Sequence, residues 1–314
     1  GKYNEAEASY RQTIALKENH VNAHNNLGVL LRELGRLDES ESALRKAIIN
    51  KADFAGALNN LGITLQEMGK LDEAEKNLRQ AIVLKPEFAD AYYNLGITLK
   101  KSKRIDEAEV FYRQAIELNP GYIKAHINLG IALKEMGRPE EAEVTFRKAI
   151  ALNPEYAEAF NNLGIALNEM GRPEEAEVTF RKAIALNPEY AEAFNNLGIA
   201  LKGLGRLEEA EANFRKAIAL NPNCAKNHLN LTLMKNFKSK DEQFFKMHEL
   251  YLNKNIPEEE RCHINFGLAK AYEDLGDFRQ AFKHFSEGNA LRKKLLGYEI
   301  NQDIELFEHI KSSY

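Results

Sequence analysis

EMGRPEEAEVTFRKAIALNPEYAEAFNNLGIAL, residues 135–167, decides the fold, because the same 33 residues recur without a change at residues 169–201. The offset between the two copies is 34 residues. Leu-Gly pairs follow the same interval along most of the chain, at 27–28, 61–62, 95–96, 129–130, 163–164 and 197–198. Self-similarity at a fixed period predicts that one supersecondary unit is stacked many times.

Each unit has the pattern of two helices. In residues 123–156, apolar residues recur at helical spacing, and Gly137 and Pro139 then end one helix and begin the next. We expect Asn153 to cap the following helix, with Pro154 at its first position. The sequence therefore predicts an all-α fold built from antiparallel helix pairs.

The repeats divide the chain when the Leu-Gly pair is placed at positions 7 and 8. We expect a half repeat with only the second helix at 1–20, six complete units at 21–224, a divergent helical hairpin at 225–256, a repeat-like unit at 257–296 and a capping helix at 297–314. The half repeat predicts a truncated or cleaved N-terminus. It also predicts an uncovered apolar strip that includes Ala6, Tyr10 and Ile14.

Residue size at four positions predicts how the helices of a unit pack. Glycine at position 8 and alanine at position 20 let the two helices approach, while large residues at positions 11 and 24 fill the flanks. Two departures from this pattern predict locally lower stability. Lys103 replaces a turn glycine and Ser40 replaces the alanine at position 20, each at a cost of about 1 kcal/mol.

This pattern resembles the tetratricopeptide repeat (TPR) family. Its signature asks for Leu and Gly at positions 7 and 8, a large residue at 11, Ala at 20, an aromatic at 24, Ala at 27 and Pro at 32. Residues 157–190 meet it with Leu163, Gly164, Leu167, Ala176, Phe180, Ala183 and Pro188. The resemblance covers residues 1–224 and implies a right-handed superhelical solenoid.

Composition argues against several classes of function. The chain has 43 Lys and Arg against 47 Asp and Glu, for a net charge of −4, so no basic field would attract nucleic acid or a membrane surface. No apolar run has membrane-spanning length. Cys224 and Cys262 lack metal-ligand spacing and indicate thiols in a reducing compartment. We therefore expect a cytoplasmic protein.

No residue pattern predicts catalysis, a metal site or a cofactor, because the chain has no phosphate-binding glycine loop, ligand cluster or nucleophile motif. The Cys262-His263 pair lies on a predicted helix, where adjacent side chains diverge. Glutamate pairs such as 140–141 lie in first helical turns and complement the helix dipole. Three histidines at position 4 are expected to fill space between helices: His24, His126 and His228.

A column of asparagines is the most informative feature for function. Position 6 is asparagine in every complete unit and in the divergent one: Asn26, Asn60, Asn94, Asn128, Asn162, Asn196 and Asn230. Asparagine is a poor mid-helix residue, and position 6 shares its helix face with positions 2, 9 and 13. A primary amide both donates and accepts, so a row of amides could hold the backbone of an extended peptide. Alternatively, each asparagine bonds its neighbouring repeat, and both interpretations stay open.

The column resembles the superhelical TPR region of O-linked N-acetylglucosamine transferase, where equivalent asparagines hold substrate backbone. This likeness implies a peptide-binding concave groove to which Asn161 and Asn195 also belong, and it implies no transferase activity. TPR domains that clamp the acidic tails of chaperones are less similar, because they need Lys at position 5 and Asn at position 9. One basic cluster is either an acidic-ligand site or a solvated helix end: Lys100, Lys101, Lys103 and Arg104.

Residues 257–294 are similar to the segment that joins TPR arrays to the sulfotransferase domain in bacterial TPR-sulfotransferase proteins. In that family the donor-binding loop lies downstream, so catalysis would belong to residues beyond Tyr314. We therefore expect a non-enzymatic scaffold that binds a peptide or partner protein in its groove, or else the substrate-recruiting arm of a larger sulfotransferase. A third expectation is self-association through the strip that contains Tyr10 and Ile14.

Overall fold

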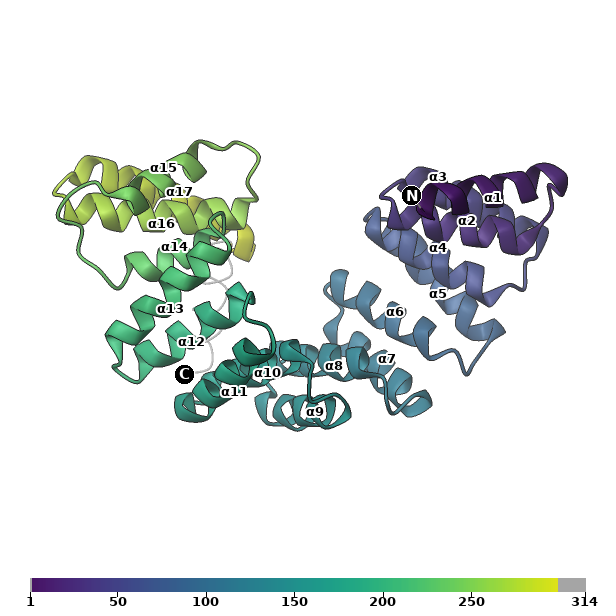
Figure 1. Ribbon diagram of the computed structural model, residues 1–314, viewed down its shortest axis with the longest axis horizontal. Coiled ribbons are helices and arrows are strands. Elements are labelled where there is room, and N and C mark those ends of the chain that lie inside the picture. Colours follow the sequence, from purple (N-terminus) through teal and green to yellow (C-terminus); the bar gives the residue numbers. More distant parts are fainter. Residues whose placement is uncertain (1, 299–314) are drawn as a thin grey trace, which may run out of the picture. The chain divides into compact units, whose positions relative to one another are not determined.

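The computed structural model describes residues 2–298, and these residues form seventeen α-helices and no strand (Figure 1). The chain consists of two compact units, Gly1–Ala166 and Leu167–Tyr314, which we call unit 1 and unit 2. The predicted all-helical fold of stacked helix pairs is confirmed for the described residues. The helix predicted at residues 297–314 lies outside the described residues from residue 299 onward.

Unit 1 starts with the single helix α1 and continues with hairpins that pair each even-numbered helix with the next. Its helices are α1 (Lys2–Leu16), α2 (Val21–Glu33), α3 (Leu37–Asn50), α4 (Ala55–Glu67), α5 (Leu71–Leu84), α6 (Ala89–Lys101), α7 (Ile105–Leu118), α8 (Ile123–Glu135), α9 (Pro139–Leu152) and most of α10 (Ala157–Glu169). Unit 2 contains α11 (Pro173–Leu186), α12 (Ala191–Gly203), α13 (Leu207–Leu220), α14 (Ala225–Thr232), α15 (Glu242–Leu252), α16 (Glu258–Asp274) and α17 (Phe278–Leu296).

The glycine at position 8 faces the large residue at position 24 of the same hairpin. A methyl group on Gly130 would lie 2.5 Å from Cε1 of Phe146, and one on Gly96 would lie 2.6 Å from Cε1 of Tyr112. These distances are far below van der Waals contact, so only glycine fits. The expectation that small residues meet each other and large ones fill the flanks is therefore wrong for position 8, whose glycine contacts the large buried side chain at position 24 of the partner helix.

The lower stability predicted at Ser40 and at Lys103 has different outcomes at the two residues. Ser40 is fully buried, and its hydroxyl donates to the Gly28 carbonyl over 2.7 Å and lies 3.0 Å from the Thr64 hydroxyl. These bonds compensate the buried hydroxyl, so the structure does not support a cost at Ser40. Lys103 has φ of 61°, and it is the one non-glycine residue with positive φ among residues 2–298. Glycine with positive φ holds the equivalent turn at residues 35, 69, 137, 171, 205 and 276, so the strain predicted at Lys103 is present.

The turn between repeats differs from the prediction. Asn153 is the C-cap residue of α9, with φ of −142°, and its Oδ1 accepts a hydrogen bond of 3.0 Å from the Glu155 amide. The next helix, α10, begins only at Ala157. Asn153 therefore stabilises the turn that follows α9, and Pro154 lies inside that turn instead of opening a helix.

Rings of four charged side chains connect the second helices of successive repeats. Arg138 binds Glu141 of its own helix over 2.6 Å and Glu109 of the preceding repeat over 2.8 Å, while Arg113 binds the same two carboxylates. Hydrogen bonding from Arg138 lowers the pKa of Glu141. Glu141 therefore has two ion-pair partners besides the helix dipole expected from the sequence. Three further rings have the same geometry: Glu7, Arg11, Arg36 and Glu39; Glu75, Arg79, Arg104 and Glu107; Glu177, Arg181, Arg206 and Glu209.

Unit 2 departs from the repeat at α14. This helix has 8 residues, whereas α12 at the equivalent place has 13, and residues 233–241 lead from α14 to α15. Phe244 stands at position 20, where the regular repeats need a small residue, and it is only 2% exposed. Because a phenylalanine cannot lie against the backbone of the facing helix, α15 touches α14 little and α16 packs against α14 instead.

A buried cluster of rings holds the C-terminal hairpin against α15. His248 Nε2 lies 2.6 Å from the Tyr272 hydroxyl, and His284 stacks on Tyr272 with ring centroids 5.5 Å apart. His284 Nδ1 lies 2.8 Å from Asn265 Oδ1, and burial lowers the pKa of His284 to about 4. When Leu268 is placed at position 7 of this unit, Phe285 falls at position 24. Phe285 is only half-buried, and its neighbour His284 is 2% exposed instead.

The close contact at position 8 predicts different outcomes for two glycines of α12. A methyl group on Gly198 would lie 2.6 Å from the Phe214 ring, whereas one on Gly203 would meet nothing within 4 Å. Gly198→Ala should lower the free energy of unfolding by about 2 kcal/mol. Gly203→Ala should leave it unchanged or raise it by about 0.5 kcal/mol. Urea denaturation followed by circular dichroism compares them, and equal effects would contradict the packing described.

The burial of His284 predicts an acid-sensitive unit 2. The pKa of a histidine in an unfolded chain is about 6.5, so below that pH the unfolded chain gains a proton that the folded chain does not bind until pH falls to about 4. Between pH 7 and pH 5 the unmodified protein should lose about 2 kcal/mol more stability than His284→Gln, which cannot titrate. Denaturation curves at the two pH values test this, and equal losses in both proteins would disprove it.

Candidate functional site

The first helices of the hairpins line the inner side of each unit. In unit 1, α2 contacts α4, α4 contacts α6 and α6 contacts α8. Among the described residues, the backbones of successive second helices, such as α3 and α5, do not approach each other in this way. Elements that lie closest together are on the inside of a curved stack. In unit 2, α12 and α14 are in contact in the same manner.

The asparagine column connects neighbouring repeats on this inner side. The side-chain amide at position 6 donates to the residue at position 5 of the preceding repeat over 2.8–3.0 Å, in four pairs: Asn60 to Asn25, Asn94 to Asn59, Asn128 to the Tyr93 hydroxyl, and Asn230 to Asn195. Asn26 instead accepts from Asn25 over 3.1 Å. Asn162 stands opposite Ile127, whose side chain accepts no hydrogen bond. The inter-repeat bond weighed in the sequence analysis is thus present at four positions.

These bonds use one N–H of each amide. The Oδ1 atoms of Asn60, Asn94 and Asn128 have no hydrogen-bond partner among residues 2–298, and the three side chains are half-buried. Beside them runs a row of half-buried aliphatic residues at position 9. We call the two rows of unit 1 the amide face: Asn60, Asn94, Asn128 and Asn162 with Ile63, Ile97, Ile131 and Ile165.

Three members of the predicted set are too buried to present their amides to solvent. Asn161 and Asn195 are 1% and 2% exposed, and Asn196 is 7% exposed. Asn195 accepts the bond from Asn230, so its oxygen supports the neighbouring repeat. Position 5 therefore supplies acceptors to the column, while the half-exposed amides belong to position 6.

Most residues of the basic cluster at the end of α6 bind other residues of the chain. Lys100 binds Glu135 over 2.8 Å, Lys101 donates to Gln66 over 3.3 Å, and Arg104 belongs to one of the charged rings. Three of its four cations therefore have partners within the chain, and the interpretation as an acidic-ligand site stays a prediction.

The histidines at position 4 are core residues, as expected from the sequence. Each Nε2 lies 2.7–3.0 Å from a backbone carbonyl six residues earlier, and the side chains are 1–6% exposed: His24, His126 and His228. Cys262 is buried, and burial raises the pKa of its thiol. Within residues 2–298, no three His, Cys, Asp or Glu side chains come together in a way that could hold a metal ion. The helices of this part of the chain include none with the length and apolarity of a membrane span.

The apolar strip of α1 is less open than predicted. Ala6, Tyr10 and Ile14 are half-buried, and the last two pack against a cluster formed by Leu27, Leu31 and Ala43. The next hairpin therefore covers part of the strip, and self-association through it stays a prediction.

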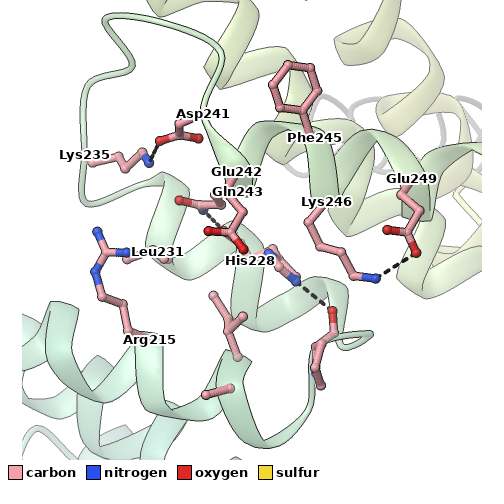
Figure 2. A pocket seen from close by; sticks show the side chains of 13 residues that line it. Arg215, His228, Leu231, Lys235, Asp241, Glu242, Gln243, Phe245, Lys246 and Glu249 are labelled. Carbon is pink, nitrogen blue, oxygen red and sulfur yellow. Dashed lines mark hydrogen bonds and ion pairs between the residues drawn. The ribbon is translucent and has the colours of Figure 1, made fainter.

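A cleft of about 840 Å³ in unit 2 was not foreseen from the sequence (Figure 2). It lies among α13, α14 and α15, with Arg215 and Ile218 on one side and Phe245 and Lys246 on the other. The signal for it was the phenylalanine at position 20, which forces α15 away from its regular place.

Comparison with known proteins identifies the repeat. Family models described as tetratricopeptide repeat or TPR repeat match residues 1–54, 66–103, 89–122, 123–156 and 157–223. A search of curated proteins finds no match.

Several solved structures share the fold. A tetratricopeptide repeat protein from Parabacteroides merdae is 21% identical, with a TM-score of 0.59 over 74% of this chain and 93% of that one. The pilF protein of Pseudomonas aeruginosa is 21% identical, with a TM-score of 0.55 over 72% and 96%. A structure of the APC/C hetero-tetramer Cut9-Hcn1 is 16% identical, with a TM-score of 0.59 over 91% of this chain and 52% of that one. At these identities the likeness concerns the fold. Together with the matched repeats, it shows that the chain belongs to the tetratricopeptide repeat family.

Proposed function

We propose that unit 1 binds an extended peptide segment of a partner protein along the amide face. TPR stacks are in general protein-interaction scaffolds, so a partner protein is the expected ligand class. The observation that carries the proposal is the row of amide oxygens at Asn60, Asn94 and Asn128, which have no partner in the described chain.

The amide face matches the chemistry of a peptide backbone. A backbone offers one N–H donor and one C=O acceptor per residue, and an asparagine side chain can satisfy either. The inter-repeat bond fixes the orientation of the Asn60, Asn94 and Asn128 amides before a ligand arrives, which reduces the entropy lost on binding. The isoleucines at position 9 would contact apolar side chains of the ligand. Such a surface reads mainly the main chain and makes limited demands on ligand sequence.

The repeat spacing sets the length of ligand that the face accommodates. Packed helices lie about 8–10 Å apart, and an extended chain rises about 3.3 Å per residue, so one repeat corresponds to about three ligand residues. The four asparagines of the amide face would therefore contact a segment of about ten residues.

The alternative, a substrate-recruiting arm of a sulfotransferase, has only the resemblance of residues 257–294 in its favour. No contact among the described residues adds to it, and we do not propose it.

Two substitutions separate ligand binding from repeat stability. Asn128→Ala and Tyr93→Phe both remove the 2.8 Å bond between α8 and α6, but only Asn128→Ala removes an amide from the face. Each should lower stability by about 1 kcal/mol. Dodecapeptides selected on the immobilised full chain from a random library should bind Asn128→Ala about tenfold more weakly by fluorescence anisotropy, and Tyr93→Phe nearly normally.

Asn162→Ala serves as a second variant, because Ile127 opposite it accepts no hydrogen bond. Its affinity for the same peptides should fall while its stability stays unchanged. Equal affinities of Asn128→Ala and Tyr93→Phe, or a library that yields no retained peptide, would overturn the proposal.

A further inference from the structure

The cleft of unit 2 lies where the regular array of second helices ends. In every complete ring of charged side chains, the arginine at position 25 binds a glutamate at position 19 of the following second helix, as Arg181 binds Glu209 over 3.5 Å and Arg113 binds Glu141 over 3.5 Å. In α13, the arginine at position 25 is Arg215. Position 19 of the following hairpin is Gln243, which carries no charge.

Gln243 does not replace the missing glutamate. Its Nε2 points into the hairpin and donates to the His228 carbonyl over 3.2 Å and to the Thr232 hydroxyl over 2.9 Å. Arg215 is left with Glu211 of its own helix, 2.6 Å away, as its one ion-pair partner within the described residues. The ring at this junction therefore lacks its fourth charged member, and Figure 2 shows Arg215 and Gln243 with no interaction between them. Phe245, two residues after Gln243, is 60% exposed beside the cleft.

Two further atoms on the wall of the cleft need a partner. His228 Nε2 lies 2.9 Å from the Pro222 carbonyl and must donate to it, which leaves Nδ1 as an acceptor. His228 is 1% exposed and burial lowers its pKa, so the ring is neutral near pH 7. His228 Nδ1 and Gln243 Oε1 are both buried without a hydrogen-bond partner. A buried acceptor without a hydrogen-bond partner is expected to bind an N–H or O–H donor.

We propose that this cleft binds an acidic peptide segment of a partner protein. A glutamate or aspartate of the segment pairs with Arg215, in the place that a glutamate of the next repeat takes at the regular junctions. Backbone N–H groups of the segment donate to Gln243 Oε1 and His228 Nδ1. Apolar side chains beside the acidic residue cover Ile218, Leu231 and Phe245. A small anion would leave these acceptors and the exposed phenylalanine without contacts, so the peptide is the better match.

The amide face does not enter this proposal. The cleft belongs to unit 2 and is formed largely by the second helices α13 and α15, whereas the amide face belongs to first helices of unit 1. A protein with both sites could hold two segments, and each site can be tested while the other is intact.

The test uses the full chain and two dodecapeptide libraries that differ at one central position, fixed as glutamate in one and glutamine in the other. Phage selection should enrich cleft binders from the glutamate library. Arg215→Gln should weaken the selected peptides about tenfold, and changing their glutamate to glutamine should have the same effect. The two changes together should weaken binding no further, because they remove one ion pair.

Two variants serve as controls. Arg45→Gln changes the same position in unit 1, where Glu73 already fills the partner place, and should leave affinity unchanged. Asn128→Ala should also leave it unchanged, which distinguishes these peptides from ligands of the amide face. Phe245→Ala, at an exposed site, should weaken binding. The proposal would be overturned if the glutamate library gave no enrichment, or if Arg215→Gln bound the selected peptides as tightly as the unmodified protein. Additive effects of Arg215→Gln and of the glutamate-to-glutamine change in the peptide would also overturn it.

Discussion

The contact between the glycine at position 8 and the large side chain at position 24 is the constraint on which the rest of the structure depends. A methyl group in place of the glycine hydrogen would lie within 2.5–2.6 Å of the facing side chain in hairpin after hairpin. This contact fixes the distance between the helices of a pair, and the pair then repeats at a constant step. Constant steps bring asparagines into a row on one side and charged rings onto the other.

The first place where this constraint is broken is also where the structure forms a new surface. Thr232 replaces the glycine at position 8 and Phe244 replaces the alanine at position 20, so α14 stops after 8 residues and α15 cannot take its regular place. The space left beside α13 is the cleft that Arg215 borders. Gln243, which stands at position 19 of the same hairpin, leaves Arg215 without the carboxylate that its equivalents bind. The altered packing and the missing ion pair therefore lie at the same junction.

The sequence predicts what depends on spacing and misses what depends on side-chain direction. The 34-residue period predicted the helix pairs, and the poor helix propensity of asparagine at position 6 pointed to a special row. Whether Asn128 bonds Tyr93 or faces solvent could not be read from spacing, because a rotation about two side-chain bonds separates the two states. The sequence places Arg138 three residues before Glu141, as the ring requires. The other two members of the ring, Glu109 and Arg113, belong to the preceding repeat, and spacing within one repeat does not reveal them. The cleft depends on how Phe244 repacks its surroundings, which follows from volumes in three dimensions.

Asn60, Asn94 and Asn128 each donate one amide N–H to the preceding repeat and keep a side-chain oxygen without a partner. The central claim is that this row is a ligand-binding surface. Side-chain NH₂ resonances in an NMR spectrum of the asparagine-labelled protein test it most directly. When a selected peptide is added, the resonances of Asn60, Asn94, Asn128 and Asn162 should shift, while those of Asn77 and Asn213, which bond carbonyls of their own second helices, should stay in place. Unchanged resonances in the row, or shifts confined to Asn77 and Asn213, would contradict the account.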